Sequence, residues 1–218
     1  MARKKTAAKK PASKARPKAA ANTADSADAI IDAALALAAE SGWPAVTMAA
    51  VADLAEIPLG EALLFAPTRA HLLVRFLDRL DAANLAGVTR AADDGSVRDR
   101  LFDVLMRRFD LLNQKRDGVR AVIKGVPRDP PSAALLACRV GRSAAALLGA
   151  AGISAEGLRG FARIQGLKAV MAFALRAWMT DDSDDMAKTM AAMDRALSQA
   201  ERLVNLKVSR KTGDAAAG

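Results

Sequence analysis

Cysteine, histidine and tyrosine are almost missing from this sequence of 218 residues, which holds one Cys, one His and no Tyr. A single cysteine, Cys138, excludes a disulfide bond within the chain and fits a reducing compartment. Cys138 and His71 together are too few for a zinc site of the ordinary ligand number. The glycines also lack the spacing of a phosphate-binding loop. We therefore expect no metal, no other cofactor and no catalytic centre.

Aromatic residues are scarce as well, at 4% of the chain, and we find no alternating runs of β-branched residues. The apolar half of the sequence is rich in Ala, Leu and Met, which lose little on entering a helix. It is also large enough to bury a sizeable core. These features predict an all-α protein with about nine helices.

No uninterrupted apolar run reaches the length of a membrane span. The most apolar long stretch, residues 160–179, contains Arg163, Lys168 and Arg176. The N-terminus lacks the apolar core of a secretory signal. We therefore expect a cytoplasmic protein without a transmembrane segment.

Positive charge is concentrated at one end of the chain. Residues 1–22 hold eight basic and no acidic residues, out of a formal net charge of +9 for the whole chain. Their Lys, Ala and Pro composition cannot form a packed core, so residues 1–25 are predicted to be a disordered basic tail. Such a tail can contact DNA, a role that we assign to Lys4, Lys5, Lys9 and Lys10. A solubilising tail, or contact with an acidic membrane surface, is an open alternative.

The stretch from Val46 to Leu73 has the pattern of two short helices, a tight connection and a longer helix. Thr47 is a suitable N-cap for the first helix. Pro58 is tolerated near the start of the second, because a helix leaves its first N–H groups unbonded. Pro67 ends that helix and Thr68 starts the next. This arrangement is typical of a helix-turn-helix.

Residues 27–80 resemble the N-terminal domain of the TetR (tetracycline repressor) family of bacterial regulators. The matching residues are Ser41-Gly42-Trp43, Thr47, Val51-Ala52, Ala55, Ile57, Gly60, Pro67-Thr68-Arg69 and Leu72. The resemblance implies a DNA-binding head at residues 26–72 and a helical ligand-binding and dimerisation body at residues 73–208. Residues 209–218 are expected to be a frayed tail.

The resemblance also implies DNA contacts in the head, with residues 59–65 entering the major groove. The head residues assigned to DNA are Thr47, Leu59, Gly60, Thr68 and Arg69. The chain departs from the family near this helix, with Glu56 at a usual Gly, and with Pro58, Leu63 and Phe65-Ala66 at other characteristic positions. Residues 27–85 hold eight acidic residues against three basic ones, a net charge of −5. The basic tail would compensate for this negative charge, because phosphate contacts need Lys or Arg.

The body offers flexible and aromatic side chains suited to an apolar ligand pocket. The pocket residues that we predict are Leu105, Met106, Phe109, Met171, Phe173 and Trp178. An ordinary filled core is the alternative.

The last helix carries an apolar stripe at alternating spacings of three and four residues. The residues assigned to a dimer interface are Met186, Met190, Met193, Leu197 and Val204. Two long antiparallel helices at the C-terminus favour a symmetric dimer through a four-helix bundle. Packing of the stripe on the chain's own body is the alternative.

Two functions fit these patterns. The first is a dimeric TetR-like transcriptional regulator that binds DNA and senses a small apolar molecule. The second follows from a weaker resemblance, at Ser41-Gly42-Trp43, residues 128–132 and the segment from Trp178 to Met186, to the ubiquinone-biosynthesis auxiliary family. That family implies an isoprenoid lipid ligand and a degenerate head on a TetR-like scaffold. The acidic head favours the lipid carrier, whereas the helix-turn-helix spacing and the cationic tail favour the regulator, which we predict.

Overall fold

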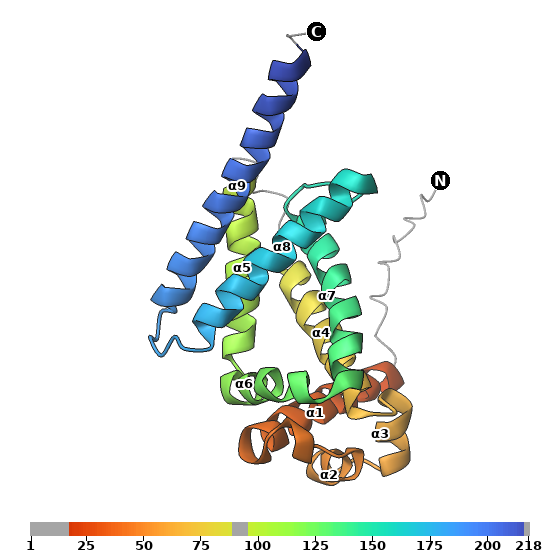
Figure 1. The fold of residues 1–218 in the computed structure, drawn as a ribbon. Helices are drawn as coiled ribbons and strands as arrows, with labels where there is room; N and C mark the ends of the chain where they lie inside the picture. Colours follow the sequence, from red (N-terminus) through yellow and green to blue (C-terminus); the bar gives the residue numbers. More distant parts are fainter. Residues whose placement is uncertain (1–17, 89–95, 216–218) are drawn as a thin grey trace, which may run out of the picture.

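The structure is a computed structural model that describes the backbone of residues 18–88 and 96–215, and side chains from residue 24 to 88 and 96 to 202. Within these ranges the chain forms nine α-helices and two short 3-10 helices, and holds no β-strand. Figure 1 shows α1, α2 and α3 gathered at one end, with α4, α5, α7, α8 and α9 extending away from them. The prediction of an all-α fold with about nine helices is confirmed.

The head consists of α1 (Lys18–Ser41), the 3-10 turn η1 (Trp43–Ala45), α2 (Met48–Leu54) and α3 (Leu59–Phe65). Helix α1 begins eight residues before the predicted head boundary at residue 26. The added segment is rich in alanine, the best helix former, so the helix extends back into the region predicted to be a disordered tail. Lys4, Lys5, Lys9 and Lys10 lie outside the described residues.

Helix α4 (Arg69–Ala86) joins the head to the body and packs along α7 (Pro130–Ala150). Helices α5 (Val97–Asn113) and α6 (Arg116–Gly125) follow, and the 3-10 turn η2 (Val126–Arg128) leads into α7. Helix α8 (Gly157–Trp178) packs against α9 (Ala187–Ala215). Helix α9 therefore continues past residue 209, where the sequence predicted a frayed end.

Helix α7 bears on the prediction that no apolar segment reaches the length of a membrane span. It is long and apolar enough, by length and composition, to cross a membrane, and it is the one such helix in the part of the chain that the structure describes. In this structure it packs on α4 and α8 instead. Its Arg139 is buried and bonded to carboxylates of α4, so one side of α7 packs against the body.

A buried charged network ties α4, α5 and α7 together. The Asp81 carboxylate of α4 pairs with Arg108 of α5, and it accepts from Arg139 Nη2 and Ser143 Oγ of α7, both at 2.7 Å. Arg139 Nε also donates to Asp78 at 2.7 Å. Burial raises the pKa of Asp81, but the bonds from Ser143, Arg108 and Arg139 outweigh it and leave that pKa below its usual value. The network fixes the helix that leaves the head.

Helix α6 lies unusually close to the head. A Cβ added at Gly118 would lie 2.3 Å from the Leu35 carbonyl oxygen of α1, and one added at Gly125 would lie 2.5 Å from Trp43 Cβ. Both separations are far below van der Waals contact. The two glycines therefore allow α6 to pack directly on α1 and η1.

Candidate nucleic-acid interface

Helices α2 and α3 pack as a compact pair at the end of the molecule (Figure 1). Thr47 Oγ1 accepts from the Ala50 N–H at 3.2 Å and caps α2, as predicted. Val51 and Ala62 are fully buried between the head helices. Glu56, in the turn, has a φ of 54°, a backbone conformation that glycine adopts most easily. These contacts set α3 at a fixed angle to α2, as a helix-turn-helix requires.

The outward face of α3 is apolar. Leu59, Leu63 and Leu64 are 44%, 40% and 88% exposed. Gly60 is exposed beside them, and a Cβ added there would meet no atom within 4 Å. Glu61, on the margin of this face, is the one charged residue of α3. The face that would meet a DNA groove therefore contains no side-chain hydrogen-bond donor.

Three of the residues predicted to contact DNA, Thr47, Thr68 and Arg69, lie at two helix N-termini. Thr47 is exposed at the start of α2, and Thr68 is exposed at the start of α4, where Oγ1 lies 2.9 Å from His71 Nδ1. Arg69 is held differently. Its Nε donates to Asp129 Oδ2 at 2.8 Å and its Nη1 to the Pro44 carbonyl oxygen at 2.9 Å. In this structure Arg69 links the head to the body.

The partner of Arg69 is a residue that the sequence reasoning did not assign. The buried Asp129 carboxylate also accepts from Trp43 Nε1 at 3.2 Å and from Ser132 Oγ at 2.7 Å. Burial raises the pKa of Asp129, but the bonds from Ser132 and Arg69 outweigh it and hold the pKa below its usual value. An acid two residues ahead of a Pro-Ser pair is a weak signal, because the same pattern is common in helix caps.

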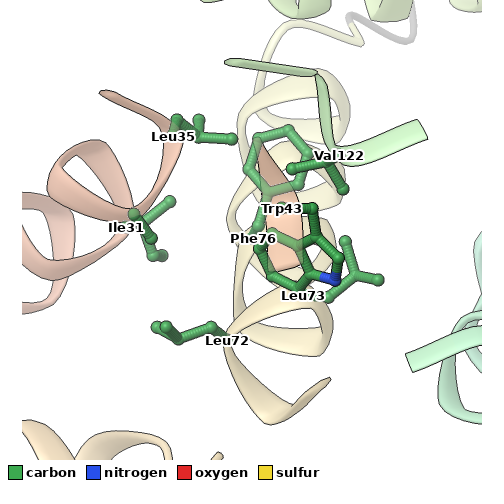
Figure 2. Close-up of a pocket in the computed structure, with 8 residues that line it drawn as sticks. Ile31, Leu35, Trp43, Leu72, Leu73, Phe76 and Val122 are labelled. Atoms are coloured by element: carbon green, nitrogen blue, oxygen red, sulfur yellow. The ribbon is translucent and has the colours of Figure 1, made fainter. Parts of the chain in front are cut away.

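An apolar joint lies beside this polar link. Figure 2 shows side chains of α1, α4, α6 and Trp43 converging on one small space. Its lining residues are Ile31, Ala34, Leu35, Trp43, Leu72, Leu73, Phe76 and Val122. The cavity measures about 10 Å³, roughly the room for a single water molecule. The joint is therefore closely packed, so a shift of α4 or α6 would displace α1 as well.

The predicted ligand-pocket residues do not all converge. Leu105, Phe109 and Trp178 are buried, and the rings of Phe109 and Trp178 lie 6.4 Å apart between centroids. Met106 and Met171 are half-buried against the same core. Phe173 is 51% exposed and faces away from it. Three of the six residues thus form a filled core, and one belongs to the outer surface of α8.

Most of the apolar stripe that was predicted to form a dimer interface packs against other residues of the same chain. Met186, Met193 and Leu197 are buried against the body, and Met190 is half-buried. The side chain of Val204 lies outside the described residues. Three large apolar side chains are instead exposed on α8, where Leu158, Phe161 and Phe173 are 91%, 62% and 51% exposed. The sequence did not separate these two surfaces, because both helices carry apolar residues on more than one face.

The described side chains hold no group of three or more His, Cys, Asp or Glu residues placed to bind a metal ion. Asp181, in the acidic segment before α9, is instead bonded to Ser183 and Thr189.

The comparisons with known proteins agree with this geometry. No protein-family model matches the chain. The HTH-type transcriptional repressor KstR of Mycolicibacterium smegmatis is 43% identical over 68 residues, which are 28% of this chain and 33% of the repressor. A TetR transcriptional regulator from Nitrosomonas europaea superposes with a TM-score of 0.65 at 24% identity, over 80% of this chain and 97% of its own. The chain has the TetR fold.

A second TetR regulator, from Rhodococcus sp. RHA1, gives a TM-score of 0.59 at 21% identity, over 82% of this chain and 97% of its own. The resemblance to the TetR family seen in the sequence is thereby confirmed. The chain spans about a third of the length of the KstR repressor that it matches. In the TetR fold of this chain, α2 and α3 form the helix-turn-helix and α4 to α9 form the body.

Proposed function

We propose that the chain is a DNA-binding transcriptional regulator. The observation that carries this proposal is the exposed helix-turn-helix of α2 and α3 at the free end of a TetR fold. The sequence similarity to transcriptional repressors supports it. The same relatives favour a regulator over the lipid carrier of the second sequence interpretation, and over an enzyme. A regulator of this kind acts on chromosomal DNA and so in the cytoplasm.

The described part of the head cannot supply the electrostatic attraction to DNA alone. Helices α2 and α3 hold no Lys or Arg. Of the three arginines of α4, Arg69 is paired with Asp129 and Arg79 with Asp28 and Asp32. The exposed Arg75 donates to the Phe65 carbonyl oxygen, so it is the one cation of α4 beside α3 without an ion-pair partner among the described residues. We therefore assign the phosphate contacts mainly to the basic N-terminal segment, with Thr47 and Thr68 positioning the head.

Binding to DNA from the gene's own upstream region, measured over a salt series by fluorescence anisotropy, tests the function. The full chain is expected to prefer this DNA to random duplex. Replacing Lys4, Lys5, Lys9 and Lys10 by Ala should lower affinity and reduce the salt slope by up to about four. Replacing Lys124 and Lys188 of the body by Ala is the control and should change neither. Equal binding to both duplexes by the full chain would reject the proposal.

A dimer is the second part of the proposed function, and the exposed face of α8 supports it. Leu158, Phe161 and Phe173 recur at helical spacing on one side of α8, with the small residues Ala162 and Ala169 between them. An isologous pair of such helices would bury this face in a four-helix bundle with α9. Light scattering should give twice the chain mass, and Phe161→Asp should halve it. The exposed Leu64 of the head is the control, because Leu64→Asp should leave the mass unchanged. A monomeric wild type would refute this part.

The third part is control by a small apolar ligand, for which the body core around Phe109 and Trp178 is the proposed site. A ligand there would have to separate these two rings, since they are in contact. The chain has two tryptophans, so Trp43→Phe leaves Trp178 as the single fluorescent reporter. Fatty acids and aromatic hydrocarbons that release DNA should then change Trp178 emission. Release of DNA without a change in emission would place the ligand elsewhere.

A further inference from the structure

The side chains on the outward face of α3 do not match the usual way of reading DNA bases. Guanine and adenine are usually recognised in the major groove by donors from Arg, Lys, Asn or Gln. Helix α3 has the sequence LGEALLF and contains none of these. Its hydrogen-bonding side chain, Glu61, can accept but cannot donate.

The apolar residues of this face form one continuous surface. At about 100° per residue, Leu59, Leu63, Gly60 and Leu64 follow one another around the helix. Ala62, on the opposite side, is completely buried. Helix α3 therefore already packs its core-facing side on α2 through Ala62. The exposed leucines belong to a different side of the helix.

Gly60 adds an independent observation. It lies in the first turn of α3, and an added Cβ there would meet nothing within 4 Å in the chain. Packing within the protein thus gives no reason for glycine here. Close approach of the α3 backbone to an external surface does give one, and it would bring the flanking leucines into contact with that surface.

The major groove offers one apolar group to such a face, the C5-methyl group of thymine. We propose that Leu59, Leu63 and Leu64 read DNA by packing on thymine methyl groups, and that specificity at these positions depends on the methyl. This inference rests on the proposed DNA-binding function and names the base that α3 recognises. A leucine that covers a methyl group removes apolar surface from water without any hydrogen bond.

The experiment compares duplexes that differ only in the thymine methyl group. The upstream duplex bound by the full chain is prepared with thymine and with uracil in its place. Uracil should weaken binding about fourfold for each thymine methyl group that a leucine covers, the change that corresponds to burying one methyl group. In the Leu59→Ala/Leu63→Ala/Leu64→Ala triple variant, the thymine and uracil duplexes should bind almost equally. Val97→Ala, which trims an exposed residue at the start of α5, should keep the full wild-type preference.

The outcomes separate this inference from the proposed function. Equal wild-type affinity for both duplexes, with preference over random DNA retained, would overturn thymine reading and leave the regulator standing. A uracil penalty that persists in the triple variant would assign the effect to duplex stiffness and would also overturn it. No preference for the upstream duplex over random DNA would remove the regulator, and thymine reading with it. Circular dichroism on each variant confirms that the helices are intact.

Discussion

Arg69 and Asp129, which are 60 residues apart in the sequence, are joined by a 2.8 Å bond from Nε to Oδ2 at the junction of head and body. The same carboxylate oxygen accepts from Trp43, which lies in the joint between α1 and α6. One carboxylate of the body therefore holds both the start of α4 and the turn after α1. This position suits a residue that sets the angle of the helix-turn-helix.

Replacing Arg69 by Met separates a structural role from a phosphate contact. If Arg69 links head and body, Arg69→Met should lower the free energy of unfolding by about 1–2 kcal/mol, because Asp129 loses a charged partner. The salt slope of DNA binding should then stay the same. Urea unfolding and anisotropy measure the two effects.

Arg128→Met is the matched control, since the Arg128 side chain is exposed and donates to the Lys124 carbonyl oxygen in its own segment. It should change stability by less than about 0.5 kcal/mol. A salt slope that falls by about one in Arg69→Met would instead assign Arg69 to a phosphate.

The two helical glycines Gly118 and Gly141 should respond in opposite directions to alanine. A Cβ at Gly118 would lie 2.3 Å from the Leu35 carbonyl oxygen, a backbone atom that cannot rotate away. Gly118→Ala should therefore push α6 from α1 and destabilise the chain by roughly 2–4 kcal/mol, as overpacking at a rigid site does. Gly141 has nothing within 4 Å of an added Cβ, so Gly141→Ala should stabilise α7 by about 0.5–1 kcal/mol. Thermal unfolding of both variants is the measurement, and a neutral Gly118→Ala would contradict the close approach.

Glu56 holds a left-handed backbone conformation in the helix-turn-helix, with φ at 54°. Glu56→Gly should remove strain and stabilise the chain by about 1 kcal/mol. Glu56→Ala removes the same charge but keeps a Cβ, so it should give no comparable gain. If both variants are equally stabilised, repulsion between carboxylates rather than backbone strain is the cause. Urea unfolding at neutral pH distinguishes the two results.

The sequence predicted the local features of the head well because they depend on neighbouring residues. Thr47 and Thr68 cap their helices through bonds that span three residues, and Pro58 and Pro67 flank α3 through their own ring geometry. Such signals lie within one turn of helix and do not depend on the rest of the fold. The resemblance to the TetR family then supplied the order of the helices.

The contacts between residues distant in the sequence could not be predicted, for a physical reason. Arg69 was assigned to DNA, and the sequence could not show that Asp129 lies beside it. The stripe through Met193 was assigned to a partner because its spacing is the same whether it packs on a second chain or on the chain's own α8. Phe173 was assigned to the ligand pocket, although its neighbour Ala174 is the buried one. Periodicity identifies an apolar face, but only tertiary packing decides what covers it.

Asp181 should give the chain a defined sensitivity to acid. Its buried carboxylate accepts from the hydroxyl of Ser183 and from the N–H and hydroxyl of Thr189, the latter two at 2.7 Å. Burial raises the pKa of Asp181, but the hydrogen bonds from Ser183 and Thr189 outweigh it and lower the pKa to about 2. The folded chain therefore holds this carboxylate ionised at a pH where the unfolded chain, with an ordinary Asp pKa near 3.9, has begun to take up a proton.

Because the folded pKa is depressed, the contribution of Asp181 to stability is complete above about pH 5 and is lost as the pH falls through 4 towards 2. Asp181→Asn keeps the shape of the side chain but cannot ionise, and its amide nitrogen cannot accept the bonds from Thr189. The variant should be about 2 kcal/mol less stable than the wild type at pH 6, by the size of the pKa shift. This difference should shrink steadily below about pH 5 in urea unfolding curves. Asp184, which is exposed in the same loop, provides the control, because Asp184→Asn should give a difference near zero throughout. A gap between Asp181→Asn and wild type that stays constant from pH 6 to pH 2 would show that packing, rather than the ionised carboxylate, holds the start of α9 against the body.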